Sequence, residues 1–140
     1  MMNVKPYSAT ALALAGLLLV GMGLYFIFLR PSLLPEDLRY IGSSLQNVKD
    51  DIPGLKNWLQ KVFWVMGGYI FATGWLIIFI ALTSFRKRLR GAFGIVAFTG
   101  ISSIGLMTVV NFMIGSDFKW VLLTFTLPWI IALILYRLHK

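Results

Sequence analysis

Four long runs of uncharged, mainly apolar residues divide this 140-residue chain. They cover residues 9–29, 62–85, 92–114 and 120–136. A helix needs about 20 apolar residues to cross the roughly 30 Å hydrocarbon core of a bilayer, so each run suits one transmembrane helix. The runs therefore predict an all-α integral membrane protein, a single domain over residues 1–140 in which four helices form an antiparallel bundle.

The composition also favours a membrane protein. Hydrophobic residues make up 59% of the chain and charged residues 13%, and the net charge is +8. An ordinary soluble domain is about a quarter charged, so this chain has too few charged residues to cover a water-exposed globular surface. Its cations lie between apolar runs instead of along one polar surface, which argues for the lipid bilayer and against nucleic acid as the partner.

Residue types that carry catalysis or metal binding are scarce. The chain has no cysteine and one histidine, His139. Its acids include two adjacent pairs, Glu36–Asp37 and Asp50–Asp51, and adjacent side chains on a helix point about 100° apart. No charged residue lies inside the four runs, which argues against a proton-coupled antiporter. We therefore predict no enzyme activity and no catalytic, cofactor or metal site.

The positions of the cations predict the orientation of the chain. Four of them lie in the short segment between the second and third runs: Arg86, Lys87, Arg88 and Arg90. Short cationic segments beside membrane helices are retained in the cytoplasm. We expect this segment and both termini to be cytoplasmic, with residues 30–61 on the outer side of a plasma membrane. The same four cations are candidate contacts for anionic lipid headgroups at the cytoplasmic face.

The connection formed by residues 30–61 carries an amphipathic pattern. Apolar residues recur every three or four positions, at Leu34, Leu38, Ile41, Leu45, Val48 and Ile52, as on one face of a helix. Pro35 suits a first helical turn and Gly42 a helix end, so two short helices are expected. We interpret them as a lid that lies on the membrane surface or caps the outer end of the bundle, with a docking platform for a partner or an extracytoplasmic ligand as the alternative.

Small residues recur on three of the four runs. In lipid, helices associate where small side chains allow their backbones to approach. The small residues are Ala9, Ala13, Gly16 and Gly23 in the first run, Gly67, Gly74 and Ala81 in the second, and Gly94, Ala97, Gly100, Ser102, Ser103 and Gly105 in the third. They predict contacts between helices, and a homo-oligomer or a membrane-protein partner.

A further set of residues is a candidate site inside the membrane. It consists of Trp75, Ser102, Ser103, Asn111 and Trp129, all within the predicted spans. A buried indole N–H seeks a hydrogen-bond partner, so the two tryptophans either pack in the core or line a ligand cavity. The amide of Asn111 is costly to bury, and we expect it to form a hydrogen bond between helices.

Two segments resemble small bacterial four-span inner-membrane proteins with a DoxX-like layout. They are Leu-Leu-Pro-Glu-Asp-Leu-Arg-Tyr-Ile-Gly at 33–42 and Val-Phe-Trp-Val-Met-Gly-Gly-Tyr at 62–69, followed by Thr73-Gly74. The resemblance implies a bacterial inner membrane and no catalytic activity. It also implies a candidate functional patch where the external loop meets the second run, formed by Pro35, Glu36, Asp37, Arg39, Gly67 and Gly68.

These patterns lead to two functional hypotheses. The first is a non-enzymatic protein that acts through interaction, as an accessory subunit, an assembly factor or a self-associating scaffold. The second is a small passive channel or carrier for a neutral or lipidic solute. A continuous polar cavity that reaches the middle of the membrane would favour the second hypothesis, and a tightly packed apolar bundle would remove it.

Overall fold

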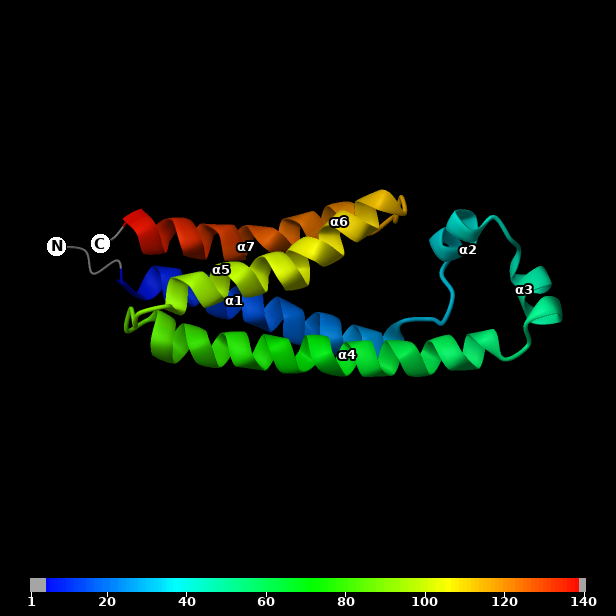
Figure 1. The fold of residues 1–140 in the computed structure, drawn as a ribbon, viewed down its shortest axis with the longest axis horizontal. Helices are drawn as coiled ribbons and strands as arrows, with labels where there is room; N and C mark the ends of the chain where they lie inside the picture. Colours follow the sequence, from blue (N-terminus) through cyan, green and yellow to red (C-terminus); the bar gives the residue numbers. More distant parts are fainter. Residues whose placement is uncertain (1–4, 139–140) are drawn as a thin grey trace.

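Helices make up all the regular secondary structure in the computed structural model, which describes residues 5–138 (Figure 1). Four stretches are long and apolar enough to cross a membrane: Tyr7–Leu29, Leu55–Phe85, Ala92–Met113 and Lys119–Leu138. The all-α prediction and the four apolar runs are thereby confirmed. The histidine at position 139 lies outside the described residues.

Three of the four long helices contain a π-helical turn. The first consists of α1 (Lys5–Leu24) and η1 (Tyr25–Leu29), and the second of α4 (Leu55–Ile80) and η2 (Ala81–Phe85). The third consists of α5 (Ala92–Gly100), η3 (Ile101–Gly105) and α6 (Leu106–Met113), and the fourth of α7 (Lys119–Leu138). The second long helix begins at Leu55, seven residues before the apolar run predicted at 62–85. Lys61 limits the uncharged run in the sequence, but a lysine does not end a helix.

Two short helices, α2 (Pro35–Ile41) and α3 (Leu45–Asp51), follow the first long helix, which confirms the prediction for residues 30–61. Gly42 ends α2 with a φ of 67°, a left-handed conformation that glycine adopts readily. The apolar pattern does not form one buried face, however. Val48 is buried whereas Ile41 and Ile52 are about half exposed, because the break at Gly42 separates the two helices.

The helix α1 is central to the arrangement. It packs against α4 on one side and against α7 on another, and the third long helix packs against α7. The start of α1, the end of α7 and the connection at residues 86–91 lie together at one end of the molecule (Figure 1). We call this the terminal end, and we call the opposite end, where α2 and α3 lie, the loop end.

Glycines bring the backbones of α1 and α4 into direct contact. A Cβ atom added at Gly23 would lie 2.5 Å from the backbone nitrogen of Phe71, and one added at Gly74 would lie 2.6 Å from that of Val20. The glycines confined in this way are Gly16, Gly23, Gly67 and Gly74. The contact faces predicted for the first two runs are therefore confirmed.

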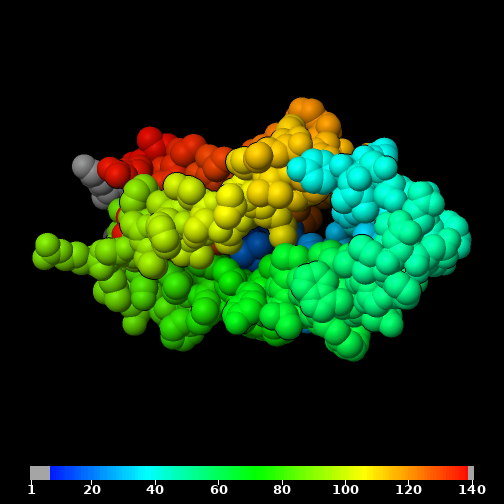
Figure 2. Space-filling view, turned by 45° about the vertical axis from the view of Figure 1, so that its right-hand side comes forward, coloured from blue at the N-terminus to red at the C-terminus, as the bar shows by residue number. Residues whose placement is uncertain are grey.

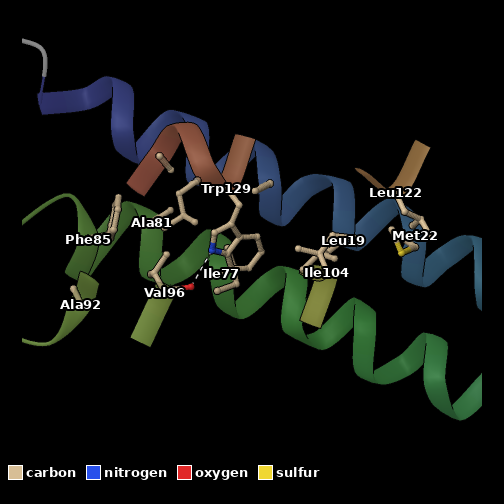
Figure 3. Close-up of a cluster of buried hydrophobic side chains, with 13 residues drawn as sticks. Leu19, Met22, Ile77, Ala81, Phe85, Ala92, Val96, Ile104, Leu122 and Trp129 are labelled. Carbon is tan, nitrogen blue, oxygen red and sulfur yellow. Dashed lines mark hydrogen bonds between the residues drawn. The ribbon is translucent and has the colours of Figure 1, made fainter. Parts of the chain in front are cut away.

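The hydrophobic core fills the terminal end and the middle of the molecule (Figure 3). Trp129 belongs to this core and is only 3% exposed. Its indole Nε1 donates a hydrogen bond to the carbonyl oxygen of Val96 at 2.9 Å. A Cβ atom at Gly100 would collide with the same indole ring. The same cluster contains small buried residues, namely Ala81, Ala92 and Ala132, and Gly100 is buried beside the ring. They allow the four long helices to approach one another here.

We expect Gly23→Ala to destabilise the protein because its methyl group would collide with the backbone of α4. Overpacking of this kind costs about 1–3 kcal/mol. Thermal unfolding in detergent, followed by circular dichroism, measures the loss as a lower Tm. The control is Gly94→Ala on α5, where a Cβ atom meets open space and no loss is expected. An unchanged Tm for Gly23→Ala would contradict the backbone contact.

Candidate functional site

A groove of about 820 Å³ lies toward the loop end, between α4 and α6. Its floor is α1, which is visible in blue between the green α4 and the yellow third helix in Figure 2. Figure 1 shows that α4 and α6 diverge toward the loop end. Ligand pockets in proteins span about 300–1,000 Å³, so the groove is large enough to hold a small molecule or part of a lipid.

The groove wall is mainly apolar and adaptable. It extends along α1 from Leu17 to Arg30, a length of about 20 Å at 1.5 Å per residue. Met22, Met66 and Met107 line it from three different helices. Unbranched, flexible methionine side chains are frequent on surfaces that accept ligands of varied shape. This wall is suited to a hydrocarbon chain.

Arg30 lies at the outer end of the groove, directly after η1. Its guanidinium lies 3.5 Å from the ring centroid of Phe63 on α4 and 5.4 Å from that of Phe26. It donates hydrogen bonds to the carboxylate of Asp37 at 3.3 Å and to the carbonyl of Pro31 at 3.0 Å. The Arg30 side chain is 11% exposed. It therefore fixes the start of α2 to the first two long helices.

Glu36 holds α2 against the opposite wall. Its side chain accepts a hydrogen bond from the hydroxyl of Ser116 at 2.9 Å, and both residues are buried. Ser116 belongs to the turn between α6 and α7, and its hydroxyl oxygen also accepts a bond from the backbone N–H of Phe118. On the other side, Ser32 donates to the side-chain oxygen of Gln60 on α4 at 2.9 Å. The segment from Ser32 to Glu36 is thus attached to both walls, and Leu34, Glu36 and Asp37 line the outer end of the groove.

The charges at this end do not balance. Arg30, Glu36 and Asp37 all line the groove, which gives one positive and two negative charges. Among residues 7–138 the ion pairs are Arg30–Asp37 and Arg39–Asp117. Glu36 is thus a buried carboxylate with a hydrogen-bond donor and no paired cation in the described chain.

The six residues predicted to form a patch where the external loop meets the second run do not come together in the structure. Glu36 and Asp37 line the groove, whereas Arg39 pairs with Asp117 at 2.7 Å on the surface. The other members are the exposed Pro35, Gly67 in the contact with α1, and Gly68 beside open space. They are separated because Gly67 faces α1 while α2 is held against the α6–α7 turn.

The five residues of the predicted intramembrane site do not meet either. Ser103 and Asn111 line the groove, Trp129 packs in the core, and Trp75 is 54% exposed on α4. Ser102 is exposed and donates to a carbonyl of its own helix. The hydrogen bond expected between helices for Asn111 is wrong, because its amide donates to the carbonyl of Met107, one turn earlier on the same helix, at 2.9 Å.

At the terminal end, the four cations of residues 86–90 have different surroundings. Arg86, Lys87 and Arg90 are exposed and remain free to meet lipid headgroups. Arg88 donates to the backbone carbonyl of Tyr136 at 2.9 Å, and its guanidinium lies 4.5 Å from the ring centroid of that tyrosine. Arg88 thus fastens the connection between the second and third long helices to α7.

Several groove residues were not predicted from the sequence, notably Arg30, Ser116 and the three methionines. Arg30 reads in sequence as the end of an apolar run, and Ser116 as part of a Gly-Ser-Asp turn. A local pattern cannot show that Arg30 stacks on Phe63 or that Ser116 donates a hydrogen bond to Glu36, because both contacts join residues far apart in the sequence. The three methionines are a signal that could have indicated the groove, since each lies on a different helix and all three line it.

No protein-family model, curated protein or solved structure matches this chain. The DoxX-like layout therefore stays a prediction. The function is inferred from the geometry of the groove and its charged end.

We expect Ser116→Ala to loosen α2. The variant removes the donor to the buried Glu36 carboxylate, and leaving a buried polar group without its partner costs about 1–3 kcal/mol. Hydrogen–deuterium exchange should become faster in residues 34–42. The matched control is Arg39→Ala, which breaks an exposed ion pair of about 0–1 kcal/mol on the same helix. Equal exchange in the two variants would contradict the role given to Ser116.

Proposed function

We propose that this protein is a non-enzymatic, multi-pass plasma-membrane protein that binds a lipidic molecule in the groove between α4 and α6 and acts as its carrier. The observation that carries the proposal is the groove itself: about 820 Å³, mainly apolar along its length, with charged residues at one end. The groove is neither the continuous polar cavity nor the tightly packed apolar bundle considered from the sequence, and it suits a lipidic solute better than a polar one. Its division of polarity matches that of an amphiphile, whose hydrocarbon chain and polar head need different surroundings.

The dimensions of the groove support the proposal. One leaflet of a bilayer contributes about half of a 30 Å hydrocarbon core, and the groove extends about 20 Å along α1 at 1.5 Å per residue. With the four long helices in the membrane, the groove would lie in the leaflet nearest the loop end. A lipidic molecule could then enter sideways between α4 and α6 without crossing water.

An accessory or assembly role is the second candidate. The small-residue faces of the first two runs are occupied by the α1–α4 contact, which weakens the motivation for self-association, whereas Gly94 in the third run faces open space. Large apolar side chains nevertheless remain exposed on and around α2 and α3, outside the predicted spans: Tyr40, Ile41, Ile52 and Trp58. A partner protein could dock there. In that case, a variant that fills the groove would still bind the partner.

We also propose that the terminal end faces the cytoplasm of a bacterial inner membrane. The exposed cations Arg86, Lys87 and Arg90 support this orientation, since such clusters resist translocation. An alkaline phosphatase fused after Lys140 should be inactive, because the enzyme needs an oxidising compartment to form its disulfides. The same fusion placed after Ser44 should be active. The reverse pattern would contradict the orientation.

Gly21→Phe tests the lipid-carrier proposal. Gly21 lines the groove and faces open space, so a phenylalanine would fill the groove without striking another backbone. Native mass spectrometry of protein released from nanodiscs should show fewer retained lipids for this variant than for the wild type. The matched control is Gly94→Phe, a glycine in open space that does not line the groove. Equal lipid retention in all three proteins would contradict the proposal.

A further inference from the structure

We infer that the molecule held in the groove is a cationic amphiphile, an alkyl chain with a positively charged ammonium head that binds against Glu36. This inference rests on the proposed function and names the chemical class of its ligand. It is carried by one juxtaposition: a buried carboxylate without a paired cation forms part of the polar end of an apolar groove.

The environment of Glu36 is the first step. The residue is 6% exposed, and the hydrogen bond from Ser116 supplies a neutral donor to one of its two oxygens. A buried charge is strongly unfavourable unless a charge of opposite sign compensates it. No ion pair with Glu36 occurs among residues 7–138, whose side chains the structure describes. A cation within the groove would supply the missing compensation.

The state of Arg30 is the second step. Its guanidinium is already engaged by Asp37, by the carbonyl of Pro31 and by the face of Phe63. It is therefore poorly placed to receive an anionic headgroup. The three charged residues lining the groove sum to −1, from one arginine and two acids. A head of charge +1 brings that sum to zero, whereas a head of charge −1 brings it to −2.

Aromatic residues give the third step. Tyr25, Phe63 and Phe118 line the same groove. Tyr25 precedes Arg30 by about one helical turn, and Phe118 lies two residues after Ser116, so both belong to the outer end. Aromatic faces attract ammonium groups, including quaternary ones, more strongly where water is excluded. The face of Phe63 is already taken by Arg30, so the carboxylate of Glu36 with the rings of Tyr25 and Phe118 forms the site for an alkylammonium head, with the alkyl chain directed toward Met22 and Met107.

The test compares headgroups on one chain length. The wild-type protein in phosphatidylcholine nanodiscs is immobilised on scintillation beads with tritiated dodecyltrimethylammonium as the probe. Unlabelled dodecyltrimethylammonium should displace the probe at a concentration at least about tenfold lower than dodecanol, dodecyl phosphate or dodecylphosphocholine, which corresponds to about 1.4 kcal/mol. An equal or better displacement by dodecylphosphocholine or by dodecyl phosphate would overturn the inference.

Glu36→Gln should remove the preference for the ammonium head and leave dodecanol binding unchanged, since the amide keeps an acceptor for Ser116 without the charge. Asp117→Asn is the control, because that carboxylate lies near the same end but is exposed and paired with Arg39.

If ammonium and dodecanol bind equally in the wild type, the inference fails while the lipid-carrier proposal stands. If neither binds, both fail.

Discussion

The close contact between the backbones of α1 and α4 is the constraint on which the rest of the arrangement depends. In hydrocarbon there is no hydrophobic force to bring helices together, so association relies on close packing at small residues. Gly16, Gly23, Gly67 and Gly74 provide that packing and fix α4 along one side of α1. Because α7 takes another side of α1 and the third helix attaches to α7, α4 and α6 are left apart at the loop end.

This arrangement gives the two halves of the molecule different characters. Toward the terminal end, alanines and Gly100 let the helices close around Trp129, which is hydrogen-bonded to Val96. Toward the loop end, methionines and phenylalanines occupy the facing positions and the helices diverge. Met22 and Leu122 belong to both the core and the groove wall. The packed half thus provides a base for the open half, and Glu36 and Asp37 of α2 line the outer end of that open half.

Local sequence patterns were sufficient to predict the four long helices, the break at Gly42 and the glycine contact between the first two runs. They failed for Gly94, which faces open space, because periodicity shows which residues share a face but not which neighbour that face meets. The candidate site was predicted in part, since Glu36 and Asp37 were among its proposed members. The four apolar runs contain no charged residue, so they gave no sign that a groove between them would be lined by a carboxylate. That carboxylate belongs to Glu36 of α2, which lies outside the runs.

The most direct test of the account is a density map at side-chain resolution of the protein in phosphatidylcholine nanodiscs containing dodecyltrimethylammonium. The account predicts that α4 and α6 remain apart at the loop end and that an elongated density follows α1 from Leu17 toward Arg30, with its head beside Glu36. A map in which Met66 and Met107 pack directly together, leaving no groove and no density above α1, would contradict it.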